Sequence, residues 1–196
     1  MGLTLNSSSL TLEAVGGGAA AAGLSEADVN TLIKAKTEWT LIETIDVSGV
    51  NAAEFDVDAT YTTYKVASDQ AFFTGHYVFL QFKSGSTVLG NEYRNSMWRG
   101  KGSSSGYVDS GSWNGFHITS YEAHDNIGTY EWIINNLESG KRATARWHYG
   151  GGNNGNQGAV TIGGGIHNNT SLVDGFKVNN PNGSWTSGKF NLYGMN

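Results

Sequence analysis

The sequence contains no cysteine, and this absence excludes several kinds of chemistry at once. Without cysteine there is no disulfide framework, no thiolate metal site and no cysteine nucleophile. Proline occurs once, and charged residues make up 15% of the chain, against roughly 25% in typical soluble domains. The 28 glycines, together with abundant Asn, Ser and Thr, disfavour a helical protein because these residues are poor helix formers. The composition is typical of short strands joined by tight turns.

The chain also lacks a surplus of positive charge. Lysine and arginine total 12 against 17 aspartates and glutamates, which gives a net charge of −5 and a pI near 5.4. Nucleic-acid binding needs a basic surface, so we expect no nucleic-acid partner. The N-terminus has no early Lys or Arg and no apolar run of signal-peptide length, and residues 16–23 are too few to span a bilayer. We therefore expect no export signal, no membrane contact and assembly in the cytoplasm.

Changes of composition divide the chain into four zones. These are an N-terminal strand segment, a Gly/Ala linker, a short helix and a β domain, over residues 1–15, 16–23, 24–38 and 39–196 respectively. The linker consists of small residues that give a flexible chain.

The first zone carries a short apolar alternation. Leu3 and Leu5 form one burst and Leu10 and Leu12 another, with serines between them. This pattern predicts a hairpin or a pair of edge strands. An isolated hairpin is marginal in water, so we expect these leucines to dock on a binding partner.

Residues 24–38 carry the signals of a short helix. Ser25 is a suitable N-cap, acidic residues follow it and lysines lie near the end, in agreement with the helix dipole. Val29, Leu32 and Ile33 fall at helical spacing and form one narrow apolar stripe. Two interpretations remain open. The stripe packs on the following domain, or it gathers three chains into a bundle.

From Trp39 onward the apolar period changes to two. Segments rich in β-branched and aromatic residues, bounded by Gly, Asn, Asp or Ser, occupy residues 40–47, 54–57, 63–69, 76–85, 86–94, 114–120, 128–137, 143–149, 158–166, 172–180 and 189–195. Many short strands with few helices among them predict an all-β sandwich or barrel.

Three stretches resemble a module of tailed-phage tail fibres and other virion appendages, as found in marine and cyanobacterial phages. The opening GLTLN resembles the start of such fibre proteins, and EWTLIET resembles the first strand of their terminal sandwich. The segments LVDGFKV and GKFNLYG resemble its closing pair of strands; the three stretches cover residues 2–6, 38–44 and 172–194. The resemblance implies a single antiparallel, jelly-roll-like β-sandwich, assembly as a homotrimer, and a structural or adhesive role in the virion.

Motifs for catalysis are weak. Residues 102–106 satisfy the G-x-S-x-G pattern, but a strand-like segment follows where a nucleophile elbow needs a helix. Glu122 and His124 lack a nearby third metal ligand, and Asp56 and Asp58 begin a calcium-loop pattern that the next residues break. We therefore expect no catalytic residue, no metal and no cofactor. A carbohydrate-active enzyme remains a lesser alternative, because paired carboxylates are recognised by distance; the candidates are Glu92, Asp109, Glu122 and Glu131.

The six tryptophans separate into two groups. Trp39, Trp132 and Trp185 lie in or beside strand patterns and are predicted to be core residues. The other three lie beside polar, Gly-rich segments, and residues 150–158 predict a long flexible loop. These tryptophans and their neighbours are the candidate carbohydrate-binding residues: Trp98, Arg99, Trp113, Asn114, Trp147, His148 and Tyr149. The same residues also suit a buried subunit interface, where Trp, Tyr and Arg are enriched.

The combined expectation is a non-enzymatic virion protein. The favoured role is a short tail fibre or appendage whose sandwich recognises the host, with surface polysaccharide as a candidate ligand. A capsid-decorating, cement or head-fibre protein is the alternative, because the chain has no repeat to build a long shaft. In either case residues 1–15 would contact another virion protein.

Overall fold

A computed structural model describes residues 2–6, 9–13, 27, 30, 38–58, 60–75, 77–101, 104–118, 126–152 and 158–196. The chain divides into two compact units, residues 1–38 with Asn196 and residues 39–195. No helix found in the described ranges combines the length and the apolar composition that crossing a bilayer demands.

The first unit contains the hairpin that the leucine alternation predicts. Strands β1 (Gly2–Asn6) and β2 (Ser9–Glu13) pair antiparallel, with Leu3 opposite Leu12 and Leu5 opposite Leu10. Because alternate positions of a strand share a face, all four leucine positions fall on the same face of the hairpin. Within residues 24–38 only Ala27, Asn30 and Glu38 are described. The expected trimer contacts lie outside the described residues: Val29, Leu32 and Ile33.

The second unit is built from strands alone in the part that the structure describes. Its strands are β3 (Thr40–Asp46), β4 (Ala52–Asp56), β5 (Thr63–Phe73), β6 (Phe79–Ser84), β7 (Thr87–Val88), β8 (Tyr93–Lys101), β9 (Ser104–Trp113), β10 (Phe116–His117), β11 (Asn126–Asn135), β12 (Thr144–Gly152), β13 (Gly158–His167), β14 (Gly175–Asn179) and β15 (Trp185–Met195).

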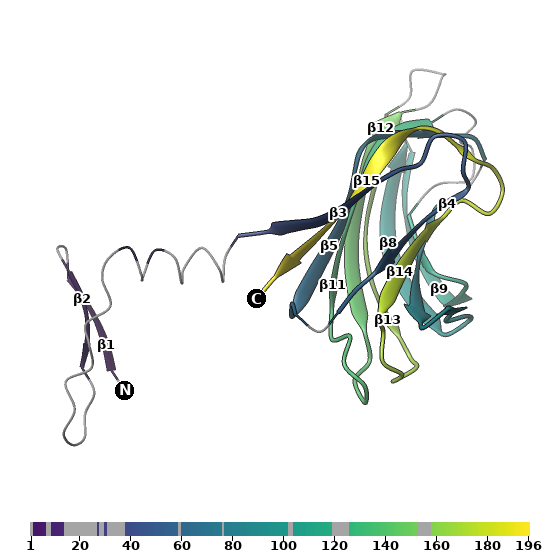
Figure 1. Cartoon of the computed structure of the whole chain (residues 1–196). Helices are drawn as coiled ribbons and strands as arrows, with labels where there is room; N and C mark the ends of the chain where they lie inside the picture. Colours follow the sequence, from purple (N-terminus) through teal and green to yellow (C-terminus); the bar gives the residue numbers. More distant parts are fainter. Residues whose placement is uncertain are drawn as a thin grey trace. The chain divides into compact units, whose positions relative to one another are not determined.

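The described strands of this unit form two antiparallel sheets. The larger sheet has eight strands in the order β3-β15-β5-β11-β12-β13-β8-β9, and the smaller has the order β10-β6-β14-β4, with β7 paired to β6. Figure 1 shows β4 and β14 of the smaller sheet lying across the larger one. The chain crosses between the sheets repeatedly: β6 with β7, β8 with β9, and β11 with β12 and β13 are consecutive neighbours, whereas the other pairings join strands that are not consecutive in sequence. The predicted antiparallel β-sandwich is confirmed.

Large aromatic side chains fill the space between the two sheets. Trp132 and Trp185 are fully buried, as predicted, and Trp185 contacts Phe190 and Phe73 with ring centroids 4.9 and 5.4 Å apart. Rings of this size bury much apolar area each and dominate the energetics of a core. Trp39 is less buried than predicted, because part of its side chain remains exposed. The Lys65 Nζ lies over its ring, 4.8 Å from the ring centre.

Several core rings lie against glycines of a neighbouring strand. Trp147 on β12 faces Gly163 on β13, where an added Cβ would lie 2.5 Å from the indole ring. The Tyr149 ring covers Gly128 on β11 in the same way, so that a Cβ added at Gly128 would clash with the ring. These glycines are therefore strand positions kept small so that a ring fits above them.

The Gly-rich segments differ from their predicted role as loops. Gly150, Gly151 and Gly152 extend β12 and pair with β13, where Gly152 lies opposite Gly158; residues 153–157 lie outside the described ones. The polar stretch around Trp98 is likewise a strand, β8, which pairs with β13 on one side and β9 on the other. Pairing on both sides explains why residues with low strand preference are extended here.

Candidate functional site: the outer face of the larger sheet

The structure separates the predicted ligand-binding residues. They come from three neighbouring parts of the larger sheet, β8, β9 with the residue after it, and β12: Trp98, Arg99, Trp113, Asn114, Trp147, His148 and Tyr149. Successive side chains of a strand point to opposite faces. Trp98 and His148 consequently reach the solvent-facing side of the sheet, while Trp147 and Tyr149 are 3% and 4% exposed and belong to the core. Burial removes these two rings from any surface on which a ligand stacks.

The remaining predicted residues lie away from Trp98. Arg99 is partly buried on the inward side of β8, where its charge acts on the buried His117. Asn114 is exposed, and its carbonyl oxygen accepts a hydrogen bond of 2.6 Å from Gln81 Nε2. The backbone of Trp113 pairs with Tyr93, and its side chain lies outside the described ones. The seven residues therefore do not form one site.

An apolar patch that the sequence did not indicate surrounds Trp98. Ile162 on β13 pairs with Trp98, and Val160 pairs with Gly100. The side chains of Trp98, Ile162 and Val160 are 43%, 58% and 37% exposed, respectively. The Trp98 ring lies along its own strand above Gly100, where a Cβ would be 2.7 Å from the ring. Gly100 leaves room for the ring to lie along the strand. Period-two alternation could have placed Val160 and Ile162 together, but it does not say which face is inward.

Polar side chains continue this patch across the sheet. His148 on β12 lies opposite Ile162 on one side and Glu131 on the other. Its Nδ1 is 3.7 Å from Glu131 Oε1, and Lys65 Nζ is 4.0 Å from Glu131 Oε2. The Lys65 ammonium also lies 4.5 Å from the ring centre of Tyr193. An aromatic surface followed by an imidazole, a carboxylate and an ammonium offers both stacking and hydrogen bonds, which is what a hydroxylated ring ligand requires.

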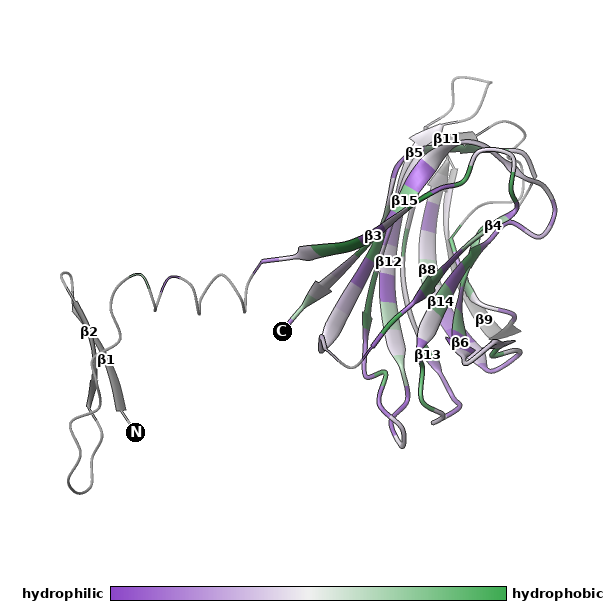
Figure 2. Ribbon diagram, in the orientation of Figure 1, coloured by the Kyte–Doolittle hydropathy of each residue, from purple (hydrophilic) through white to green (hydrophobic). Residues whose placement is uncertain are grey.

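Strand β3 forms one edge of the larger sheet and, among the described strands, pairs with β15 alone. Its Leu41 and Ile42 point to opposite faces of the sheet and are 55% and 41% exposed. Figure 2 shows the apolar colour along β3. An edge strand with unpaired backbone groups and apolar side chains on both faces is suited to pairing with another chain.

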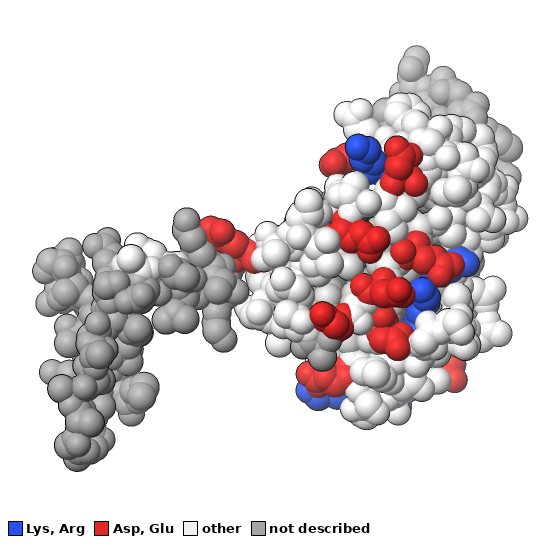
Figure 3. Space-filling model, viewed as in Figure 1, with Lys and Arg blue, Asp and Glu red and all other residues white. Residues whose placement is uncertain are grey.

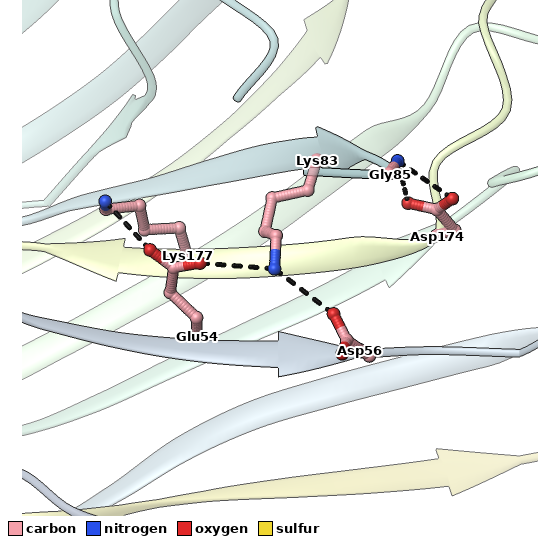
Figure 4. Close-up of polar contacts among 6 residues, drawn as sticks. All are labelled: Glu54, Asp56, Lys83, Gly85, Asp174 and Lys177. Carbon is pink, nitrogen blue, oxygen red and sulfur yellow. Dashed lines mark hydrogen bonds and ion pairs between the residues drawn. The ribbon is translucent and has the colours of Figure 1, made fainter. Parts of the chain in front are cut away.

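A charged network covers the outer face of the smaller sheet. Lys83 on β6 reaches across β14 to β4, where its Nζ lies 3.1 Å from Asp56 Oδ1 and 3.2 Å from Glu54 Oε2 (Figure 4). Gly175 of β14 lies between them in register, and a Cβ there would be 3.2 Å from the lysine side chain. Burial alone lowers the pKa of Lys83, but the hydrogen bonds to Asp56 and Glu54 raise it above its ordinary value. Because Lys83 is paired with both carboxylates, the network links β6 to β4 across β14, and we call these three side chains the clamp.

We expect this clamp to respond asymmetrically to substitution. Lys83→Met keeps the apolar stem over Gly175, frees the exposed Asp56 carboxylate to water and leaves Glu54 paired with Lys177 at 2.9 Å, so the free energy of unfolding should change by less than about 1 kcal/mol. The double variant Glu54→Gln with Asp56→Asn leaves the buried ammonium without a charged partner and should cost about 2 kcal/mol or more. Urea unfolding at pH 7 measures both. A larger loss for Lys83→Met than for the double variant would contradict the clamp.

Motifs for catalysis and metal binding gain no support from the geometry. Ser104 of the G-x-S-x-G pattern begins strand β9, so no helix follows the motif. Among the described residues no three His, Asp or Glu side chains gather as a metal site. Glu122 and His124 lie outside the described residues.

The candidate site is thus the aromatic and polar band on the outer face of the larger sheet, carried by Trp98, Ile162, His148, Glu131 and Lys65. Its members come from five neighbouring strands of the sheet, of which β11, β12 and β13 are consecutive in sequence whereas β5 and β8 come from earlier parts of the chain. No protein-family model, no curated protein and no solved structure matches the chain.

Proposed function

We propose that the chain is a non-enzymatic structural protein of a tailed-phage particle, held by its N-terminal hairpin and displaying its sandwich for attachment. The observation that carries the proposal is the separate first unit, whose hairpin register places four leucine positions on one face. A two-stranded hairpin is marginal alone in water, and a contiguous apolar face is typical of an interaction site. The leucine face therefore suits docking on another virion protein.

The sandwich supplies features suited to the adhesive part of the proposal. The band from Trp98 to Lys65 combines a flat ring with donors and acceptors, so the favoured ligand is a host surface polysaccharide. The edge strand β3, with exposed Leu41 and Ile42, supports self-association, which we propose to be a homotrimer. A short tail fibre or appendage is the favoured position in the virion, and capsid decoration is the alternative.

Substitutions on the two faces of the hairpin test the docking role. The double variant Leu5→Ser with Leu10→Ser removes apolar area from the proposed docking face, whereas Thr4→Ser with Thr11→Ser changes the opposite face at the neighbouring cross-strand pair. Burying a leucine side chain contributes about 1.5–3 kcal/mol, so losing two should reduce incorporation into particles at least tenfold. The threonine variant should be incorporated normally. Quantitative mass spectrometry of purified particles made with each full-length variant gives the ratio.

Two controls make this experiment decisive. Light scattering of both purified variants checks that the leucine change leaves self-association of the chain unaltered. Separation of heads from tails before mass spectrometry shows which part of the particle holds the chain, and recovery with heads would favour the capsid alternative. Equal incorporation of the leucine and threonine variants would overturn the assignment of the leucine face to docking.

A further inference from the structure

A pocket of about 290 Å³ opens at one end of the sandwich, where three connections converge. They are the segments that follow β4, β11 and β13. Its walls are mostly aromatic and aliphatic, and its residues are Val57, Asp58, Tyr61, Thr62, Tyr64, Leu137, Glu138, Leu172, Val173 and Asp174. The volume lies at the lower end of the range of small-molecule sites, which is roughly 300–1,000 Å³.

Backbone hydrogen bonds hold the three connections together. Val57 N donates to Asp174 O at 2.8 Å, and Val173 N donates to Leu137 O at 3.0 Å. The Asp174 carboxylate accepts a bifurcated hydrogen bond from Gly85 N, which lies 2.8 Å from Oδ1 and 3.0 Å from Oδ2 (Figure 4). The walls of the pocket are therefore fixed without a ligand, which lowers the entropic cost of binding.

Two tyrosines give the pocket an aromatic corner. The rings of Tyr61 and Tyr64 lie edge to face, with centroids 6.0 Å apart and planes at 83°. Tyr64 is tied to the core through Phe176, at 5.7 Å, and its hydroxyl donates to the carbonyl oxygen of Asp58. The Tyr61 ring lies on Gly194 of β15, where a Cβ would be 2.3 Å from the ring. Both rings are thus held in place by neighbouring strands.

The charge of the lining favours a positively charged ligand. The lining contains three acidic residues, Asp58, Glu138 and Asp174, and no Lys, Arg or His, although the Asp174 carboxylate already accepts from Gly85 N. Hydrogen bonds from the side chain and backbone of Thr60 hold the pKa of Asp58 below its usual range, so this carboxylate stays ionised at neutral pH. Lys141 pairs with Glu138, and both side chains are more than half exposed, so this pair is weak.

Further acidic side chains lie on the surface beside the pocket. Glu54 and Asp56 lie on β4, directly before the segment that contributes Asp58, and their charges are offset by ion pairs with Lys83 and Lys177. Figure 3 shows acidic side chains gathered over the face that carries β4 and β14, with few basic ones among them. A negative surface around a cleft raises the local concentration of cations and disfavours anions.

We propose that this pocket binds a small organic cation, an ammonium group carrying apolar substituents. The apolar substituents would contact Val57, Leu137 and Val173, and the positive charge would lie between the half-buried Tyr61 ring and the acidic rim. Tyr64 is 1% exposed and packs edge to face against Tyr61. Aromatic faces attract cations through the ring quadrupole, and this is a known mode of recognising quaternary ammonium groups. The proposal does not depend on where in a virion, or on which polysaccharide, the sandwich acts.

The test compares two probes of the same shape and different charge. Choline carries a trimethylammonium group, and 3,3-dimethylbutan-1-ol is its neutral isostere. Titration of each into the full-length chain at pH 7, followed by calorimetry and by amide chemical shifts, should show choline binding at least about 10-fold more tightly. The shifted amides should be those of residues 57–58, 60–62, 137–138 and 172–174. Equal affinity of the two probes, or no shift in these residues at saturating choline, would overturn the proposal.

Variants of the pocket separate the contribution of its carboxylates to binding from that of the Tyr61 ring. Asp58→Asn and Glu138→Gln each remove a charge, and each should weaken choline binding several-fold without affecting the neutral isostere. Gly194→Ala should also weaken it by displacing the Tyr61 ring, although no group of the lining is removed. Asp46→Asn is the matched control, because this exposed carboxylate accepts from the backbone N–H two residues on, as Asp58 does, and lies outside the lining; it should leave the affinity within about twofold. Unchanged affinity in all three pocket variants would contradict the assigned site.

Discussion

Gly163→Ala is expected to lower the free energy of unfolding by about 2–3 kcal/mol, whereas Gly164→Ala leaves it unchanged or raises it. The two glycines are adjacent in β13 but face opposite sides of the sheet. A Cβ on Gly163 would lie 2.5 Å from the Trp147 indole, which is 3% exposed and packs against Phe116 at 5.6 Å. The buried ring has no free space into which to move, so the added methyl strains the core.

The neighbouring position provides the control within the same strand. A Cβ on Gly164 would meet only the Ala145 carbonyl oxygen, at an ordinary 3.8 Å. Alanine there removes conformational freedom from the unfolded chain without a clash in the folded one. Urea unfolding of both variants, followed by tryptophan fluorescence, gives the two changes. A double variant with Trp147→Phe should recover part of the loss from Gly163→Ala, and absence of any recovery would show that the ring contact is not its cause.

Acidification should destabilise the sandwich through His117. This imidazole is 1% exposed and packs against the rings of Tyr77 and Phe79, with ring centroids 5.1 Å from each. Burial, with a smaller effect of the nearby Arg99, lowers the pKa of His117 to about 3 from its ordinary value of 6.5. The unfolded chain therefore takes up a proton on this side chain as the pH falls below 6.5, while the folded chain stays neutral until about pH 3.

The direction and the window of this effect follow from proton linkage. Stability is fully present above pH 6.5 and falls by about 1.4 kcal/mol per pH unit towards the pKa of the folded state, which gives roughly 3 kcal/mol by pH 4. His117→Phe removes this contribution and keeps a buried ring of similar size. The wild-type protein should be the more stable of the two at pH 7. Its free energy of unfolding should fall towards that of the variant as the pH decreases, and should lie below it by pH 4. Parallel pH profiles would show that His117 does not titrate between the two states. Other titrating groups act equally in both proteins and cancel in the difference.

Much of the sandwich could be predicted because its strands follow the two-residue period. Segments such as 128–137 and 143–149 alternate cleanly, and each coincides with most of a strand. Strand β8 could not be predicted in this way, because Arg94, Asn95, Ser96, Arg99 and Lys101 break the apolar pattern. These residues are extended since β13 and β9 pair with them on both sides, and such long-range pairing is not encoded locally.

The candidate site was harder to predict than the fold. Trp98, Trp147 and Tyr149 have similar polar and glycine neighbours in sequence, yet Trp98 is exposed and the other two are buried. The difference depends on the parity of each position within its strand, and a single missed strand boundary inverts that parity. The pocket was not foreseen at all, because its residues come from three connections far apart in the chain. No local spacing in the sequence indicates that these connections meet.

The glycines that carry rings also constrain how the sequence can diverge. Gly128 with Tyr149, and Gly163 with Trp147, each occupy one shared volume that two side chains cannot fill together. A descendant chain that first acquires a smaller residue at position 147 is free to gain a side chain at position 163. A chain that first gains a side chain at 163 meets a steric clash with Trp147. Homologous sequences should therefore show correlated exchange at these two pairs of positions, and the order of substitutions along a lineage should run from the ring to the glycine.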